Sequence, residues 1–369
     1  MQLSGDMEAD FLQEGTFWWL TGIEEPGWRL VVDSAGGGHA VLFRPERDET
    51  RTIFDGATTD DDIRAVSGIE KIKSAGEFEH ELRQWRRRHP LVKSLKPVEH
   101  GKFVHNPALH DTAKLLDRIF EKTEDCTRTI YELRAIKQPE EIRRIREAVK
   151  LTIKTFAAYR DQLADLKSEY GIEAFFTSAF RSSNAHHAYH PIVAAGERAC
   201  TLHYGKNNQT FMKKHGILID IGARYQGYSA DITRTYCLAP TKRFTEVHAA
   251  VERAHHRCIG LLKPDLPVND YIAAVDEIMK DALFEVGLLS DRNDQQTYRK
   301  YFPHAISHGL GADTHDPLGS PRYFRPGMVL TVEPGIYIPE EGIGMRIEDD
   351  ILITEDGHEN LSAALSTKL

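Results

Sequence analysis

Two aspartates interrupt strand-like apolar segments and are spaced to face each other. Asp220 lies in the run Ile217–Ile221, and Asp231 lies in the returning segment. A turn centred between Tyr225 and Gln226 would place both carboxylates on one face of an antiparallel hairpin. Opposed carboxylates among apolar residues repel each other and are costly to bury, and a bound cation removes both costs. The pattern predicts a metal site; the alternative is an edge hairpin with two solvated aspartates.

A second segment, residues 328–354, repeats this arrangement with glutamates. Glu333 and Glu348 lie in apolar runs on either side of the turn Pro339–Gly342, so a hairpin places them opposite each other. Two divalent cations would neutralise all four carboxylates. Ligation by oxygen favours Mn²⁺, with Co²⁺, Fe²⁺ or Zn²⁺ as alternatives.

Histidines and one arginine complete the set of chemically active side chains. His304, His308 and His315 cluster in YFPHAISHGLGADTHD, and His203 lies in ACTLHYGKNN. A lone histidine is more often a packing or surface residue, but the cluster favours at least one metal ligand. Arg346 and Glu348 are two residues apart, so they share a strand face. Arg346 is therefore expected to orient that carboxylate or to bind an anionic group of a substrate.

The elements that must position these side chains divide the chain into three parts. We predict a smaller mixed α/β domain at residues 1–125 and a junction at residues 126–138. Residues 139–369 are predicted to form an α+β domain that contains both hairpins. In the first part we expect strands at Trp28–Val32, Ala40–Phe43 and Thr52–Phe54, and helices at Glu77–Arg88 and Pro107–Glu121. In the last part we expect helices at 139–166, Thr245–Leu262 and Val268–Val286, and further strands at Ile192–Ala195 and Thr201–Tyr204.

Composition excludes several classes of function. The 369 residues are 41% hydrophobic and 28% charged, which is typical of a globular protein. A net charge of −9 argues against a general nucleic-acid or anionic-membrane binder. No apolar run approaches the length of a membrane span, and the acidic start shows no signal peptide. Four scattered cysteines without a CxxC motif indicate free thiols in the cytoplasm.

Several of these segments resemble the proline-specific metallopeptidases of the pita-bread fold, especially the Xaa-Pro aminopeptidases. The matching segments are LIDIGARYQGYSADITRTY, HAISHGLGADTHD, VLTVEPGIYI and GIGMRIEDDILITEDGHENLSA. Looser matches are FWWLTGIEEP, LRAIKQPEEI and YHPIVAAGERACTLHY. The resemblance implies a pita-bread catalytic domain at 139–369 behind a creatinase-like N-terminal domain whose lead-in is shortened.

The resemblance also implies a role for each candidate residue. Two metal ions would be bound by Asp220, Asp231, His308, Glu333 and Glu348, with Asp231 and Glu348 bridging them. A water held between the metals would be the nucleophile, and Glu333 would also act as the general base. His203, His304 and His315 would line the substrate side, with Arg346 beside the ligands.

The implied activity is hydrolysis of the N-terminal Xaa-Pro bond of peptides with proline at the second position. The implied enzyme is a cytoplasmic homo-oligomer, a dimer or tetramer. An Xaa-Pro dipeptidase with the same site is the first alternative, although the tail EDGHENLSA favours the aminopeptidase branch. A catalytically inactive binding protein on this fold is disfavoured, because such proteins typically lose ligands and five are intact here. A methionine aminopeptidase is disfavoured because that class generally lacks such an N-terminal domain.

Overall fold

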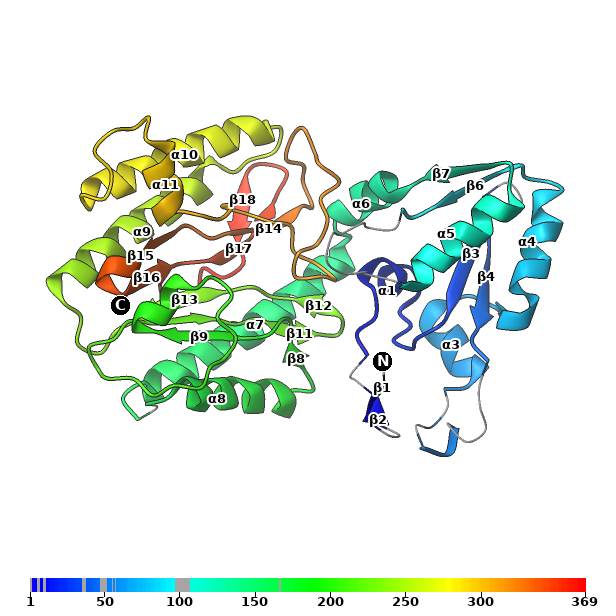
Figure 1. The fold of residues 1–369 in the computed structure, drawn as a ribbon, viewed down its shortest axis with the longest axis horizontal. Helices are drawn as coiled ribbons and strands as arrows, with labels where there is room; N and C mark the ends of the chain where they lie inside the picture. The colour runs from blue at the N-terminus through cyan, green and yellow to red at the C-terminus, as the bar shows by residue number, and fades with distance from the viewer. Residues whose placement is uncertain are drawn as a thin grey trace. The chain divides into compact units, whose positions relative to one another are not determined.

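The chain forms two compact units, which are described separately. The computed structural model describes residues 2–4, 7–8, 11–34, 38–46, 52–54, 56, 58–96, 107–165 and 167–369. The units are Met1–Ile130 and Tyr131–Leu369, and the division falls within 126–138 (Figure 1). Within the described ranges, every helix is too short or too polar to span a lipid bilayer.

The smaller unit combines helices with short sheets. Its strands are β1 (Gln2–Ser4), β2 (Met7–Glu8), β3 (Arg29–Asp33), β4 (His39–Arg44), β5 (Lys71–Ser74), β6 (Leu91–Ser94) and β7 (Lys122–Asp125). Its helices are α1 (Gly15–Thr21), α3 (Asp60–Ser67), α4 (Phe78–Arg86) and α5 (Pro107–Ile119), with the 3-10 turn η1 (Ala75–Glu77). Helix α6 (Thr127–Ala135) crosses into the larger unit. Because β4 pairs antiparallel with β3 and parallel with β5, the sheet is mixed.

Strand β4 is the centre of the smaller unit because both of its faces are buried. Val41 and Phe43 point to one side, where they pack against Phe78 of α4. Leu42 points to the other side and packs with Ile63 of α3. This alternation follows from the two-residue period of a strand, and each such buried side chain contributes about 1.5–3 kcal/mol.

Most predicted elements of the smaller unit are confirmed with shifted ends. The strands predicted at Trp28–Val32 and Ala40–Phe43 are β3 and β4, and the two predicted helices are α4 and α5. The strand predicted at Thr52–Phe54 is wrong, because these residues are helical. Ile53 and Phe54 are 82% and 69% exposed, so no sheet face buries them.

The larger unit contains both carboxylate hairpins. Its strands are β8 (His186–His187), β9 (Ile192–Ala195), β10 (Ile217–Asp220), β11 (Ala223–Tyr225), β12 (Tyr228–Ser229), β13 (Thr233–Tyr236), β14 (Val329–Val332), β15 (Gly335–Ile338), β16 (Ile343–Arg346), β17 (Asp349–Ile353) and β18 (His358–Asn360). Its helices are α7 (Pro139–Gln162), α8 (Glu169–Ser182), α9 (Lys242–Leu261), α10 (Val268–Glu285) and α11 (Gln295–Tyr301), with the 3-10 turns η2 (Gly196–Cys200) and η3 (Pro339–Glu341).

Helices cover both sides of these strands. Helix α7 packs on β11 and β12 of the first hairpin, and α8 packs on the neighbouring strands β8 and β9. Helix α9 packs on the strands of the second hairpin and against α10 (Figure 1). The strands pair antiparallel in the orders β13-β10-β9, β12-β11-β8, β14-β17-β18 and β15-β16. Helices packed on antiparallel hairpins confirm the predicted α+β class.

The three predicted helices of this unit are α7, α9 and α10, and the strand predicted at Ile192–Ala195 is β9. The strand predicted at Thr201–Tyr204 is wrong, because this segment turns back on itself. Local bonds form the turn, since Tyr204 N donates to the Thr201 carbonyl oxygen at 3.2 Å. The buried carboxylate of Glu169 in α8, a helix that the sequence pattern does not predict, adds contacts from a distant segment. It accepts hydrogen bonds from Tyr204 Oη at 2.9 Å and from Gln209 N at 3.0 Å.

Candidate functional site

The first hairpin has a different register from the predicted one. Asp220 pairs with Thr233, and the turn lies at Gln226 and Gly227, whose φ angles are 48° and 83°. Two consecutive residues with positive φ form the tight turn that matches the twist of a hairpin. Asp231 therefore lies two residues before the partner of Asp220. The prediction of directly opposed aspartates is wrong, and they are diagonal neighbours.

Gly222 allows the strands to approach closely between the two aspartates. A Cβ atom at Gly222 would lie 1.6 Å from the carbonyl oxygen of Ala230, a separation that no side chain can adopt. The position is therefore restricted to glycine by close backbone approach rather than by its φ angle.

The second hairpin has the predicted register. The pairs Val332–Asp349 and Gly335–Arg346 flank Glu333 and Glu348 in β14–β17 and β15–β16. The strand register is the same in both flanking pairs, so the residues between them continue it and Glu333 lies opposite Glu348. The prediction of directly opposed glutamates is confirmed.

The two hairpins meet at Thr233 and Glu348. The Glu348 amide donates to the Thr233 carbonyl oxygen at 3.1 Å, and Thr233 Oγ1 donates to Glu348 Oε2 at 2.6 Å. This contact joins strands that are more than a hundred residues apart in sequence. Thr233 orients a candidate ligand, and no sequence pattern marks it for that role.

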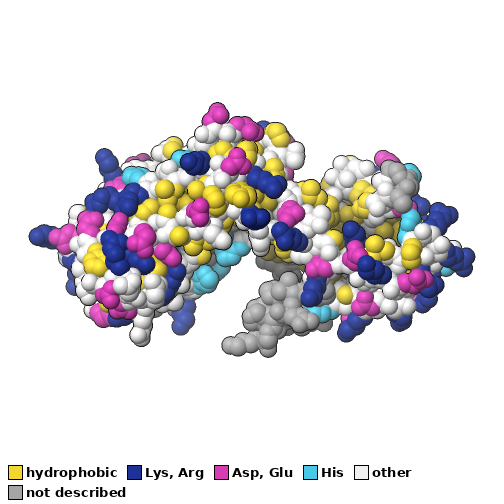
Figure 2. Space-filling view, turned by 90° about the horizontal axis from the view of Figure 1, so that it is seen from above, with side chains coloured by type: hydrophobic (Ala, Val, Ile, Leu, Met, Phe, Trp, Pro, Cys, Tyr) yellow, Lys and Arg dark blue, Asp and Glu magenta, His cyan; other side chains and the backbone are white. Residues whose placement is uncertain are grey.

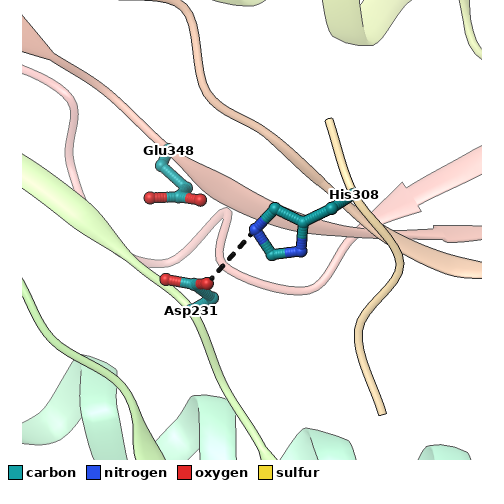
Figure 3. A group of neighbouring side chains, drawn as sticks. All are labelled: Asp231, His308 and Glu348. Atoms are coloured by element: carbon teal, nitrogen blue, oxygen red, sulfur yellow. Dashed lines mark ion pairs between the residues drawn. The ribbon is translucent and has the colours of Figure 1, made fainter. Parts of the chain in front are cut away.

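His308 reaches the carboxylates because its segment runs along β14. Its carbonyl oxygen accepts from Thr331 N at 2.9 Å. Its Nε2 lies 3.5 Å from Asp231 Oδ2 and 3.6 Å from Glu333 Oε1. One ligand atom each of Asp231, His308 and Glu348 lies within 4.8 Å of the others, and the three side chains converge in Figure 3. The arrangement can hold a metal ion.

Asp220 is held by protein partners on the same face. Its carboxylate accepts hydrogen bonds from Arg346 Nη2 and from Tyr189 Oη. Arg346 is buried and also donates to Tyr337 Oη at 2.9 Å, whereas its Nε lies 3.9 Å from Glu348 Oε2. Arg346 therefore orients Asp220 more directly than Glu348. Tyr189 and Tyr337 were not predicted, since isolated tyrosines carry no sequence signal for such a role.

The electrostatics of the site favour bound cations. Burial, reinforced by neighbouring carboxylates, raises the pKa of Asp231 and Glu348 well above the usual range. Burial, together with the Asp220 carboxylate, raises the pKa of Glu333 to about 7 against the opposing effect of Arg346. Burial lowers the pKa of His308 to about 4, which keeps the imidazole neutral and able to bind a metal. Raised carboxylate pKa values indicate negative charge that protein groups do not compensate, and divalent cations fit this deficit.

The other three histidines gather beside these ligands. His304 Nε2 is 2.9 Å from Tyr337 Oη, and its Nδ1 is 3.6 Å from Glu333 Oε2. The ring of His315 lies 4.2 Å from that of His308, centre to centre. His203 is exposed and lies close enough to influence the pKa of both His304 and His315, which is lowered chiefly by burial. All three predicted substrate-side histidines therefore lie in one region.

A pocket of about 410 Å³ borders His304. It is lined by Val268, Tyr271, Ile272, Val275, Asp276, Arg299, Phe302–Ser307, Leu318 and Phe324. On the face of the larger unit seen in Figure 2, apolar side chains gather between charged ones. The pocket provides an apolar wall next to a histidine of the predicted substrate side.

Comparisons with known proteins identify related families. The sequence model of the family described as Metallopeptidase family M24 matches residues 143–355 of this chain. The sequence model of the Aminopeptidase P N-terminal domain matches residues 1–92. The chain is 32% identical to the Xaa-Pro aminopeptidase of Escherichia coli K12, over 99% of this chain and 89% of the relative. It is 32% identical to human Xaa-Pro aminopeptidase 3, over 98% of this chain and 76% of the relative.

Solved structures show the same architecture. A putative aminopeptidase P from Bacillus anthracis has a TM-score of 0.88 at 29% identity, covering 99% of this chain and 89% of that one. Aminopeptidase P from E. coli in its low-pH form has a TM-score of 0.86 at 30% identity, with the same coverage. These similarities confirm the expected pita-bread domain behind a smaller α/β domain.

Proposed function

Because the chain belongs to metallopeptidase family M24, we propose that it is an aminopeptidase that hydrolyses the N-terminal Xaa-Pro bond of peptides. One observation carries the proposal: two hairpins and a histidine loop bring four carboxylates and an imidazole together on a buried face. The relatives named above supply the substrate class.

We assign the metal centre to Asp220, Asp231, His308, Glu333 and Glu348, as a site for two divalent ions. The excess of buried carboxylate oxygens supports two ions rather than one, and favours Mn²⁺ over softer metals. When bound, such ions supply Lewis acidity, which lowers the pKa of a water and polarises the scissile carbonyl.

Glu333 is placed to act as the general base. Its carboxylate lies among the assigned ligands, 3.6 Å from His308 Nε2, where it could accept a proton from a water held by bound metal ions. His304 lies within 3.6 Å of it and has a pKa lowered to about 4, chiefly by burial, so it remains neutral. We assign His203, His304 and His315 to binding the substrate and stabilising its tetrahedral intermediate, and Arg346 to holding Asp220.

A paired assay tests this function. Protein treated with EDTA is expected to lose hydrolysis of an Xaa-Pro-Xaa tripeptide, and added Mn²⁺ is expected to restore it. Activity that resists the chelator would exclude a metal-dependent mechanism. In the same assay, Xaa-Pro dipeptides should be poorer substrates than tripeptides. The reverse order would favour an Xaa-Pro dipeptidase.

Three further assignments accompany this function. We propose residues 1–125 as the N-terminal domain, 126–138 as the junction and 139–369 as the catalytic domain. We propose a cytoplasmic enzyme, which the four free cysteines support. We also propose a homo-oligomer, a dimer or tetramer, which light scattering of the purified protein would test.

A further inference from the structure

A buried cluster of charges lies behind the loop that carries His308 and His315. The Asp316 carboxylate accepts from Arg134 Nη2 at 2.5 Å and from Lys137 Nζ at 2.9 Å. The side chains of Arg134, Lys137 and Asp316 are each at most 2% exposed. Their chain positions are about 180 residues apart, so the cluster joins the start of the larger unit to the histidine loop.

The cluster also shapes the loop itself. Asp316 N donates to the Gly309 carbonyl oxygen at 2.8 Å, which closes the loop, and Asp316 Oδ1 accepts from Asp313 N at 3.1 Å. A Cβ atom at Gly311 would lie 2.8 Å from Asp316 Cγ and 2.9 Å from Lys137 Cε. Glycine at this position therefore leaves room for the carboxylate and the ammonium group to meet.

The two histidines of the loop are held in different ways. His308 is anchored by the sheet: besides the bond to its carbonyl oxygen, its amide donates to Thr331 Oγ1 at 3.2 Å. His315 lies on the returning limb and immediately precedes Asp316. Disturbing the cluster should therefore move His315 more than His308.

We propose that Asp316, held by Arg134 and Lys137, is a positioning residue that sets His315 beside the metal centre. This inference rests on the proposed function, in which His315 acts on the substrate side. Stability alone is a poor explanation for the cluster, because buried ion pairs are often no more stabilising than apolar residues of similar volume. A fixed geometry for the returning limb accounts for all three charges.

The test is a double-mutant cycle in the full-length metal-loaded enzyme. Lys137→Met removes one partner of Asp316 and leaves Arg134 in place, and it should lower kcat/KM about 10- to 100-fold with unchanged metal content. In a His315→Ala background the same change should cost less than about twofold, because its target is already absent. In a His203→Ala background it should keep its full effect.

Asp313→Asn is the matched control. Asp313 pairs with the same arginine at 2.7 Å from the same loop, but its side chain is 39% exposed. This variant should keep kcat/KM within about twofold of wild type. If Lys137→Met does not fold, Asp316→Asn, which keeps the size of the side chain and removes the charge that Arg134 and Lys137 hold, takes its place in the cycle and in the NMR comparison.

A second readout does not depend on activity. In protein loaded with diamagnetic Zn²⁺, Lys137→Met should shift the ring nitrogen resonances of His315 in ¹⁵N-histidine NMR spectra, assigned by their loss in His315→Ala, and leave those of His304 in place. The inference would be overturned if Lys137→Met lowered kcat/KM equally in the wild-type and His315→Ala backgrounds. It would also be overturned if Lys137→Met had wild-type kinetics or left the His315 resonance unshifted. A wild-type enzyme inactive on all Xaa-Pro peptides would instead refute the proposed function, and the NMR comparison would still decide the role of Asp316.

Discussion

The two carboxylate hairpins have the same sequence pattern but different registers. In the second hairpin the register on both sides of the glutamates follows the predicted turn, and Glu333 faces Glu348. In the first hairpin the turn lies one residue later, at Gln226 and Gly227, so Asp220 faces Thr233. The backbone conformation of the turn, and not the spacing of the acidic residues, therefore decides which side chains are opposed.

The registers lead to different ways of balancing charge. Asp220, displaced from Asp231, has Arg346 and Tyr189 as partners. Glu333 and Glu348 face each other, and burial raises the pKa of both. Asp220 should therefore depend less on bound cations than Asp231, Glu333 and Glu348, whose pKa values burial raises.

The largest expected effect concerns the second hairpin. Glu333→Gln removes the negative charge of a proposed metal ligand and also removes the general base. We therefore expect kcat to fall by about 10²- to 10⁴-fold or more. Steady-state kinetics on a tripeptide would measure it. Glu341→Gln, in the exposed turn of the same hairpin, is the control and should leave kcat unchanged. A near-normal kcat for Glu333→Gln would rule out its assigned role.

The next effect tests the close approach in the first hairpin. Gly222→Ala places a methyl group against the Ala230 carbonyl, so the strands must separate, and we expect a loss of about 3–5 kcal/mol in unfolding free energy. Urea denaturation would measure it. Gly260→Ala in α9, where a Cβ meets no atom within 4 Å, should stabilise by about 0.5–1 kcal/mol. Equal effects of the two changes would contradict the packing argument.

The third prediction concerns pH and metal. In metal-free protein the folded state keeps a proton on Glu333 up to about pH 7, whereas the unfolded chain loses it near pH 4.5. Stability should therefore fall as pH rises through this window, by about 2–3 kcal/mol from this residue. Melting curves at pH 5 and pH 8 would show the fall, and Mn²⁺ should abolish it. A metal-free protein that is more stable at pH 8 would contradict the charge balance described here.

The smallest effect concerns the turn that sets the first register. Gln226 adopts a φ of 48°, a conformation that asparagine accepts more readily than glutamine. Gln226→Asn should raise the unfolding free energy by about 0.5 kcal/mol with kcat unchanged. Differential scanning calorimetry would detect the rise in Tm. A lower Tm would show that glutamine makes a contact that outweighs its backbone cost.

Local patterns were sufficient where short-range physics decides the structure. Pro139 opens α7, and Gln138 N bonds to Glu141 Oε2 at 2.8 Å, an N-terminal pattern visible in the sequence. Local patterns failed at Thr201–Tyr204, where a β-prone segment forms a turn and its tyrosine donates to the buried Glu169 of α8. Tyr204 and Glu169 are 35 positions apart, too far for a local sequence pattern to relate them.

Sequence by itself determined the chemistry of the site. It contains four acidic residues in apolar strands, a histidine cluster and an arginine two positions before Glu348, on the same strand face. It also determined the register of the second hairpin, since alternation and turn position are local properties. Only the tertiary structure decided that Arg346 serves Asp220, that Thr233 joins the hairpins and that Arg134 and Lys137 hold the histidine loop. These contacts join distant segments, and which of them form depends on how the buried faces pack rather than on any local spacing.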